Sequence, residues 1–451
     1  MRIHLIAIGG AAMHNLAIAL KDNGHEVTGS DDQIFEPSRS RLEKKSLLPE
    51  SMGWNASRIS IEIDAIILGM HAREDNPELL KAQELGLSIY SYPEFIYQQA
   101  LKKKRIVIAG SHGKTTITSM ILHVLKKLNF EFDYLVGAQI DGFETMVRLS
   151  EAPIIVLEGD EYLSSPIDRR PKFHLYDPHI ALISGIAWDH INVFPTFENY
   201  LEQFEIFIDQ MKKESILTFC QADETLVATV HKYGQHLDLR PYKTPQYEIQ
   251  NGKSYIMRGS ERTEVSVFGD HNLQNLNGAM MVCKSIGIVE DDFYTAIKDF
   301  KGAARRLEEI ARNNQTVVYK DFAHSPSKLE ATVKAVKKQW PDRKLFACME
   351  LHTFSSLTKE FLLEYEGTMN DADVAIVFYK EETLAQKRLD PLSIEEVKKA
   401  FGRTDIEVFT NSDQLKVRLR ELNFAQGNLL LMSSGNFGGI DVDVFGKSLI
   451  N

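Results

Sequence analysis

The sequence predicts an α/β protein with three domains. Its 451 residues are enough for about three domains of ordinary size. Short apolar runs alternate with helical patterns along the chain, as they do in folds built on parallel sheets. The content of 43% hydrophobic and 25% charged residues is typical of globular proteins with packed cores. We expect the domains to comprise residues 1–104, 105–311 and 312–451.

Composition also excludes several classes of protein. No apolar run approaches the ~20 residues that a membrane-spanning helix requires, and the N-terminus lacks a signal-peptide pattern. We therefore expect a cytoplasmic protein without a membrane partner. A net charge of −11 argues against nucleic acid as the main partner. The cysteines, Cys220, Cys283 and Cys348, lack metal-ligand spacing and are expected to be buried thiols.

The N-terminal domain begins with a glycine-rich turn between a strand and a helix. Residues 2–8 read as a strand, Gly9 starts the turn, and a second strand after the helix ends at Asp31. This order resembles the dinucleotide-binding arrangement, with Asp31 near the position of the ribose-binding acid. Ala12 and His14 depart from the glycine pattern, so a nucleotide-like ligand and a simple helix-packing turn are equally supported.

A phosphate-binding loop is predicted at residues 105–116. A buried strand, a glycine-flanked turn and a helix follow one another there, which aims backbone N–H groups at a phosphate. Lys114 can reach terminal phosphate oxygens, and the Thr115 hydroxyl can ligate a phosphate-bound magnesium ion. The loop is shorter than the standard Walker pattern, because Ile108 stands six positions before the lysine and the first glycine is Gly110.

Two further strands end in groups that suit magnesium. Glu158 follows the strand expected at 153–157, and His190 comes shortly after the strand expected at 180–183. Ligands collect at the carboxyl ends of parallel strands, where Glu158 could bridge two ions and His190 could hold the second. We expect Glu158 to pack against no other group. The alternatives are a helix-capping acid for Glu158 and a structural histidine for His190.

The remaining elements continue the α/β pattern. A charged connector at 101–105 is expected between the first two domains, and a hinge at 303–311 between the last two. The other elements expected are strands at 63–68, 316–319, 344–349, 373–378, 406–409 and 428–432, helices at 77–85, 114–128, 196–211 and 222–232, and hairpin-like runs at 246–268.

Several signatures together resemble the Mur ligase family. They are Gly110-Ser-His-Gly-Lys-Thr-Thr116, Glu158-Gly-Asp-Glu161, Asp189-His-Ile-Asn192, Gly269-Asp-His-Asn-Leu-Gln-Asn275, Gly302-Ala-Ala-Arg-Arg-Leu-Glu308 and Asp321-Phe-Ala-His-Ser-Pro326. Their order and spacing extend the resemblance over essentially the whole chain. It implies a Rossmann-like N-terminal domain for a UDP-sugar, a P-loop ATPase central domain, and a Rossmann-like C-terminal domain that presents an amine. The implied activity is ATP- and Mg²⁺-dependent amide formation in peptidoglycan metabolism.

The resemblance also implies roles for individual residues. Lys114, Glu158, His190 and His324 would be catalytic, with His324 as the candidate base for the amine, and Thr115, Glu158 and His190 would hold the metal ions. The nucleotide would be bound by Gly110, Ser111, His112, Gly113, Lys114, Thr115, Thr116, His271, Asn272, Asn275, Arg306 and Asp321. The UDP-sugar would contact Gly9, Gly10, Ser30, Asp31 and His71.

Some positions depart from the family pattern. Ser184 and Gly185 replace a common Thr-Asn pair, Lys320 stands where an acid often occurs, and Ser325 replaces a second histidine. The lysine that some members carbamylate has no counterpart, and by ungapped count its place falls at Glu205. None of these changes removes a charge that phosphoryl transfer requires.

The acceptor is the least determined part of the prediction. Stretches 168–173 and 437–440 resemble family members that join UDP-N-acetylmuramate to the tripeptide L-alanyl-γ-D-glutamyl-meso-diaminopimelate in recycling. The alternative is a member that adds L-alanine in biosynthesis. After the strand at 344–349, His352, Ser355 and Ser356 could bind acceptor carboxylates, or this stretch could be a solvated loop. Two other functions are disfavoured: a folylpolyglutamate synthase and a non-catalytic or redox nucleotide-binding protein. We expect the protein to be a monomer or a weak dimer.

Overall fold

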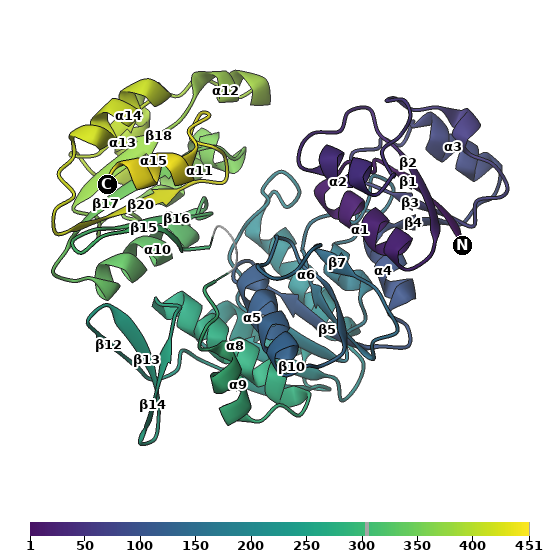
Figure 1. Cartoon of the computed structure of the whole chain (residues 1–451), viewed down its shortest axis with the longest axis horizontal. Coiled ribbons are helices and arrows are strands. Elements are labelled where there is room, and N and C mark those ends of the chain that lie inside the picture. The colour runs from purple at the N-terminus through teal and green to yellow at the C-terminus, as the bar shows by residue number, and fades with distance from the viewer. Residues whose placement is uncertain (303–305, 451) are drawn as a thin grey trace. The chain divides into compact units, whose positions relative to one another are not determined.

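The computed structural model describes residues 1–302 and 306–450. Residues 303–305 of the predicted hinge therefore lie outside the described residues. The chain forms two compact units, each assembled from several segments (Figure 1). The first comprises Met1–Trp188, Val193–Lys243 and Gly278–Ala296, and the second comprises Asp189–Asn192, Thr244–Asn277 and Ile297–Asn451. No described helix is long and apolar enough to span a bilayer.

The first unit begins with a four-stranded parallel sheet in the order β2-β1-β3-β4. Strand β1 ends two residues earlier than expected because Ala7 adopts a left-handed conformation (φ +68°) and starts the turn. Asn76 and Ser91 accept hydrogen bonds from the first turns of α3 and α4, which fixes where these helices begin. The elements are β1 Arg2–Ile6, α1 Ala11–Asp22, β2 Glu26–Ser30, α2 Ser38–Lys44, β3 Ala65–Leu68, α3 Pro77–Glu84, β4 Ile89–Ser91 and α4 Tyr92–Gln99.

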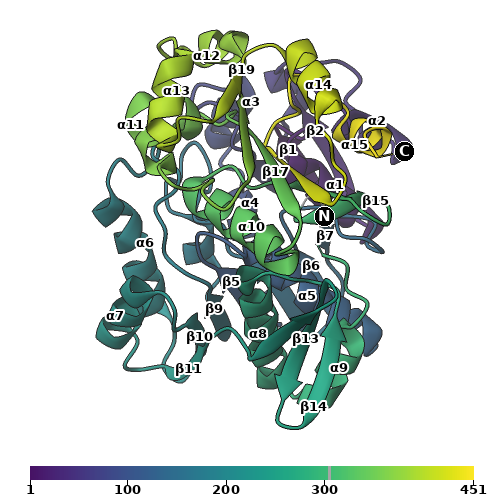
Figure 2. The ribbon, with the colours of Figure 1, turned by 90° about the vertical axis from the view of Figure 1, so that its left-hand side faces the viewer.

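A seven-stranded sheet in the order β11-β10-β9-β5-β8-β6-β7 completes this unit. All neighbouring strands are parallel except β7 at one edge. Helices α6 and α7 lie side by side (Figure 2). The elements are β5 Lys104–Ala109, α5 Lys114–Lys127, β6 Phe132–Leu135, β7 Val147–Arg148, β8 Ile154–Glu158, β9 Ile180–Ile183, α6 Phe197–Gln210, β10 Ile216–Cys220, α7 Glu224–Tyr233 and β11 Asp238–Tyr242.

The expected charged connector at 101–105 is wrong in part. Lys104 and Arg105 belong to β5, and the side chains of Lys103 and Arg105 are buried against acids. Lys103 lies 3.0 Å from Asp133, and Arg105 lies 3.0 Å from Asp177. The acidic partners of these two residues are distant in sequence, so the run of basic residues alone did not indicate their burial.

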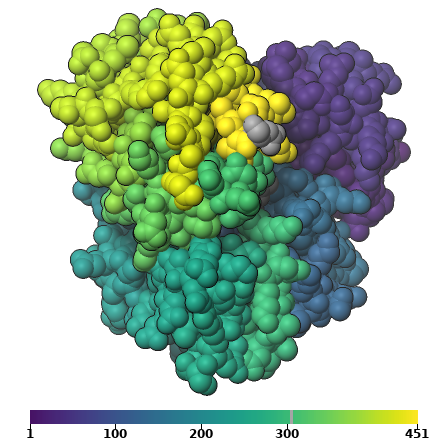
Figure 3. Space-filling model, turned by 60° about the vertical axis from the view of Figure 1, so that its left-hand side comes forward, coloured from purple at the N-terminus to yellow at the C-terminus, as the bar shows by residue number. Residues whose placement is uncertain are grey.

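The second unit contains a three-stranded antiparallel sheet and a six-stranded sheet in the order β15-β16-β20-β17-β18-β19. Only the edge strand β15 is antiparallel in the larger sheet. The C-terminal residues, yellow in Figure 3, form one contiguous part of the surface of this unit. Its strands are β12 Tyr247–Gln250, β13 Lys253–Arg258, β14 Glu261–Val265, β15 Glu308–Arg312, β16 Val317–Asp321, β17 Lys344–Glu350, β18 Val374–Phe378, β19 Glu407–Phe409 and β20 Gly427–Met432.

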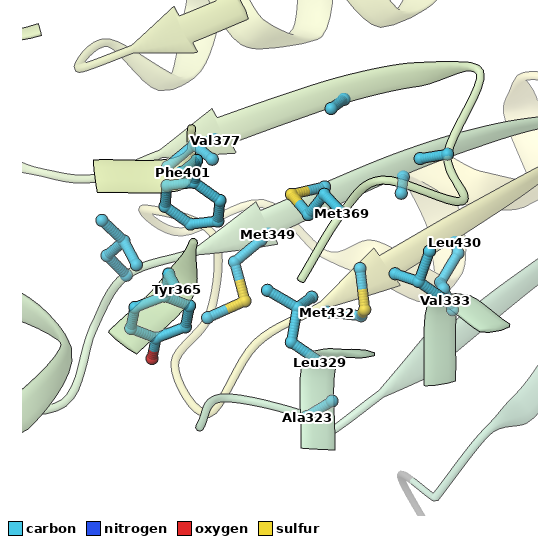
Figure 4. Packing of buried hydrophobic residues seen from close by; sticks show 14 of the residues in the cluster. Ala323, Leu329, Val333, Met349, Tyr365, Met369, Val377, Phe401, Leu430 and Met432 are labelled. Carbon is cyan, nitrogen blue, oxygen red and sulfur yellow. The ribbon is translucent and has the colours of Figure 1, made fainter. Parts of the chain in front are cut away.

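Helices cover the six-stranded sheet and close its core. Leu329 and Val333 of α10 pack with Met349 and Met432 of the central strands, as Figure 4 shows. The helices that follow β16 are α10 Pro326–Gln339, α11 Lys359–Leu362, α12 Glu381–Lys387, α13 Ile394–Phe401, α14 Ser412–Glu421 and α15 Val442–Ser448. Earlier in the chain, α8 Asp270–Ser285 begins in the second unit and continues into the first, and α9 Glu290–Ile297 belongs to the first unit up to Ala296. The expected α/β fold class is confirmed, and the expected buried, free cysteines are confirmed as well.

Candidate active site

Three neighbouring strands of the seven-stranded sheet end at one edge. Strand β5 lies between β8 and β9, so the predicted phosphate loop at 110–113 stands between Glu158 and Ser184. Gly110 (φ +118°) and Gly113 (φ +80°) both have left-handed backbone conformations. A side chain at Gly110 would also overlap the Ser184 hydroxyl. The short loop thus requires glycine because it packs directly against the segment after β9.

Hydrogen bonds attach this loop to the segment after β9. The Ser111 N–H donates to the Gly185 carbonyl (3.0 Å), and the Ala187 N–H donates to the Ser111 hydroxyl (2.7 Å). The Ser184 hydroxyl donates to the His112 carbonyl. Ser184 and Gly185, two of the positions that depart from the family pattern, therefore support the phosphate loop.

Lys114 begins helix α5 and points its ammonium group across the loop. Its Nζ donates to the Gly110 carbonyl (2.6 Å) and to Glu161 Oε2 (2.6 Å). Burial would lower the pKa of Lys114, but the carboxylates of Glu161, Asp160 and Glu158 outweigh it and raise the pKa above its ordinary value. Lys114 is therefore a fixed positive charge. Sequence reasoning had assigned no role to Glu161, although it lies within a recognised signature.

Glu158 and Thr115 present two oxygen ligands beside this lysine. The Thr115 hydroxyl donates to Glu158 Oε1 (2.8 Å), and the Gly137 N–H donates to Oε2 (2.7 Å). Glu158 is only 8% exposed, so the expectation that it packs against no other group is wrong. A carboxylate and a hydroxyl this close fit magnesium, which prefers oxygen ligands and shares them with phosphates and water. The described residues contain no cluster of three or more metal-ligating side chains, so phosphate oxygens would have to complete the shell.

His190, the other predicted metal ligand, belongs to the second unit. The segment Asp189–Asn192 is grouped with that unit, where Asp189 lies 3.3 Å from Lys328 and Ile191 packs on the core. His190 itself has a left-handed backbone conformation (φ +56°). Because Glu158 belongs to the first unit, the shared metal role of Glu158 and His190 stays a prediction.

His324 lies in the loop between β16 and α10. Its Nδ1 is 2.7 Å from the Phe322 carbonyl, and Tyr365 donates to the His324 carbonyl. Burial, helped by the positive charge of Lys328, lowers the pKa of His324 to about 4. The imidazole is therefore neutral near pH 7, with Nδ1 carrying the proton and Nε2 carrying the lone pair.

The predicted adenine and ribose residues also lie in the second unit. Burial lowers the pKa of His271 at the start of α8, and Asn272 donates to the Phe268 carbonyl (3.1 Å). Asp321 accepts a hydrogen bond from Thr332 (2.6 Å), and the Arg306 guanidinium lies over the Phe322 ring. Asn275 is buried one turn beyond His271. Their contacts with a nucleotide stay predictions.

The predicted UDP-sugar residues follow the ends of three strands: Gly9 and Gly10 follow β1, Ser30 and Asp31 lie at the end of β2, and His71 follows β3. The Gly9 N–H donates to Asp31 (2.7 Å), and Gly10 precedes α1. Ser30 is fully buried and donates to Glu78, so its hydroxyl already has a partner in the protein. His71 is exposed after β3. The glycine turn and Asp31 thus form one local structure.

Glu205, the position expected to replace the carbamylated lysine, lies on α6. The pKa of Lys232 on α7 is raised mainly by a hydrogen bond with Tyr233 and, to a smaller extent, by the negative charge of Glu205. The Glu205 carboxylate therefore lies near α7.

Ser356, a candidate ligand for acceptor carboxylates, lies in the segment after β17. Ser356 is 1% exposed and donates to the Thr353 carbonyl (3.1 Å). The expectation that its hydroxyl is available to an acceptor is therefore wrong, because a local turn uses it. His352 remains partly exposed.

Comparison with known proteins gives consistent matches over the three predicted domains. The model of the Mur ligase family catalytic domain matches residues 2–104, that of the Mur ligase middle domain 108–283, and that of the Mur ligase glutamate ligase domain 305–435. The UDP-N-acetylmuramate–L-alanine ligase of Clostridium kluyveri is 30% identical over 382 residues, 81% of each chain.

Relatives of the tripeptide type match as well. The UDP-N-acetylmuramate–L-alanyl-γ-D-glutamyl-meso-2,6-diaminoheptandioate ligase of Escherichia coli is 27% identical and covers 98% of this chain and 96% of its own. The crystal structure of a murein peptide ligase from Psychrobacter arcticus has a TM-score of 0.66, with 22% identity over 100% of this chain and 99% of its own. This structural likeness shows the fold.

Proposed function

Because the chain belongs to the Mur ligase family of ATP-dependent, amide-forming ligases, we propose that it joins the carboxylate of UDP-N-acetylmuramate to L-alanyl-γ-D-glutamyl-meso-diaminopimelate. The reaction would take place in the cytoplasm during peptidoglycan recycling. The observation that carries the chemical part is the arrangement of Lys114, Thr115 and Glu158 at one sheet edge, with a fixed cation beside two oxygen ligands. Relatives named for the tripeptide and the 168–173 and 437–440 stretches support the acceptor.

The site residues fit a two-step activation of the carboxylate. When bound, ATP with magnesium supplies a phosphoryl group, so that the muramoyl carboxylate becomes an acyl phosphate and ADP leaves. Lys114 would stabilise negative charge on the transferred group, and Thr115 and Glu158 would hold the metal ion. The amine nitrogen then attacks the acyl carbon, inorganic phosphate leaves, and a base takes the amine proton.

His324 is the proposed base. The low pKa leaves its Nε2 unprotonated at neutral pH, as a proton acceptor requires. A pKa of about 4 also makes the imidazole a weak base in the empty protein. Anionic substrate groups nearby would raise that pKa towards neutrality and strengthen the base, since an opposite charge favours the protonated form.

A second candidate is addition of L-alanine alone. One observation favours it, because relatives named as L-alanine ligases reach 30% identity whereas those named for the tripeptide reach 27%. The difference is small, and both groups share the ATP chemistry. The acceptor is thus the point at which the two proposals separate.

Steady-state phosphate release with ATP and UDP-N-acetylmuramate would decide between these acceptors. We expect kcat/KM for the tripeptide to exceed that for L-alanine by at least ~100-fold, which corresponds to ~2.7 kcal/mol and to one or two charge-assisted hydrogen bonds. Mass spectrometry of the product identifies the new amide. Equal or better use of L-alanine would favour the second candidate, and no turnover with either acceptor would contradict both.

A further inference from the structure

Helix α6 places one hydroxyl between two parts of the phosphate site. The Tyr200 side chain is fully buried, and its Oη lies 2.8 Å from Ser111 Oγ and 3.1 Å from Glu161 Oε1. Ser111 belongs to the phosphate loop, and Glu161 Oε2 lies 2.6 Å from Lys114 Nζ. Tyr200 therefore connects Ser111 of the phosphate loop with the carboxylate that pairs with Lys114.

These contacts form a path of hydrogen bonds across the phosphate site. The Tyr200 hydroxyl is placed to donate to Ser111 Oγ and to Glu161 Oε1, and Glu161 forms the ion pair with Lys114. The Ser111 hydroxyl accepts from the Ala187 N–H and donates to the Gly185 carbonyl (3.4 Å). The result is a continuous hydrogen-bonded chain from the phosphate loop to the carboxylate paired with Lys114.

We propose that Tyr200 and Glu161 are positioning residues for nucleotide phosphates, a role that rests on the ATP site of the proposed function. Glu161 aims the Lys114 ammonium across the loop, and Tyr200 holds that carboxylate and Ser111 at a fixed separation. Neither residue has to contact the nucleotide. Both ends of the chain act on groups that would face the β and γ phosphates, so its loss should affect a triphosphate and spare AMP.

Replacing Tyr200 with phenylalanine tests this role. Calorimetric titration with a non-hydrolysable ATP analogue and magnesium should show a Kd about tenfold higher in Tyr200→Phe, the size expected for losing a hydrogen bond to a charged group. Titration with AMP should show a change below about twofold. Glu161→Gln should change the two affinities in the same selective way and by more, because it removes the charge that pairs with Lys114.

Tyr176→Phe is the matched control. Tyr176 is equally buried in the same unit, but its hydroxyl has no hydrogen-bond partner among the described residues. Its removal should leave both affinities unchanged. Thermal unfolding of all variants would show whether each is folded at the titration temperature.

The outcomes are distinct. Equal weakening of analogue and AMP in Tyr200→Phe would indicate a merely structural role and overturn the inference, as would unchanged binding of both. If the wild-type protein binds the analogue but ligates neither acceptor, the proposed function is wrong and the positioning role is still decided by Tyr200→Phe. If the wild-type protein does not bind the analogue more tightly than AMP, the proposed function and the positioning role are both wrong.

Discussion

At the carboxyl-end edge of the seven-stranded sheet, side chains of α5 contact carboxylates at and just beyond the end of β8, whereas at the same edge of the six-stranded sheet the Glu350 carboxylate holds a loop that is distant in sequence. Lys114 pairs with Glu161, and Thr115 with Glu158, at the first edge. At the second, Glu350 accepts from the Phe437 N–H (2.8 Å) and from the Ser433 hydroxyl. A bound phosphate could replace Glu161 as the partner of Lys114, and magnesium could bind Thr115 and Glu158 together. The Glu350 carboxylate at the second edge instead fixes the conformation of a loop.

This difference indicates how each edge would recognise a ligand. At the first edge the side chains themselves supply the charge and the oxygen ligands. At the second, a hollow of about 220 Å³ lies at the ends of β16 and β20 and is lined by residues 435–437 of the loop that Glu350 holds and by Lys320, Asp321, Asp441 and Asp443. We predict that acceptor choice depends on the shape of this loop as well as on side-chain charge.

Removing the cation at the first edge should have the largest effect. We expect Lys114→Met to lower kcat/KM for ATP by about 10³-fold, because a preorganised charge at the transferred phosphoryl group is lost. Lys126→Met is the control, since that lysine lies near the other end of the same helix and donates to the exposed Gly142 carbonyl. Phosphate-release kinetics measure both. Comparable losses of kcat/KM in the two variants would mean that Lys114 contributes no more than an ordinary surface lysine.

The sequence could predict the first edge because its groups are close in sequence or end a strand. Lys114 and Thr115 share one turn, and Glu158 ends β8. The support from Tyr200 could not be predicted, since it lies 39 residues from Glu161 on a helix whose buried positions read simply as aromatic core. Packing between distant segments decides such contacts.

The second edge was harder to predict for a related reason. The strands of its sheet were expected nearly in full, but the polar edge strand β15, Glu-Glu-Ile-Ala-Arg, has no strong apolar pattern and was missed. No role was predicted for Glu350, and Ser356 was a candidate ligand for acceptor carboxylates because it follows a strand. Their partners, the N–H groups of a loop more than 80 residues away and the carbonyl of a local turn, are set by the folded backbone.

The His324 imidazole makes the second unit sensitive to acid. Its pKa falls from 6.5 to about 4 on folding, so between these values only the unfolded chain takes up the proton. Stability from this group is complete above pH 6.5, declines as the pH falls towards about 4, and changes no further below it. We expect the free energy of unfolding of the wild-type protein to fall over this window by up to about 3 kcal/mol more than that of His324→Gln.

Urea unfolding at a series of pH values measures this difference. His231→Gln is the control, because His231 is exposed on α7 and should leave the pH profile parallel to that of the wild-type protein. Parallel profiles for His324→Gln as well would mean that His324 is not buried as a neutral base, and its proposed role in taking the amine proton would lose its support.

The smallest effect is expected at Glu350, and it tests whether this carboxylate holds the loop at the second edge. Glu350→Gln keeps the shape of the side chain but turns an amide N–H₂ towards at least one donor of the 433–438 loop, which leaves a buried N–H unsatisfied. We expect a loss of about 1–2 kcal/mol in stability and a higher KM for the acceptor, with the Kd for ATP unchanged. Glu407→Gln is the matched control. Glu407 lies on β19 of the same sheet, and the substitution removes only its partly exposed ion pair with Arg418 of α14. A change in ATP affinity equal to the change in acceptor KM would show that the Glu350 loop serves both ligands, and the separation between the two edges would have to be abandoned.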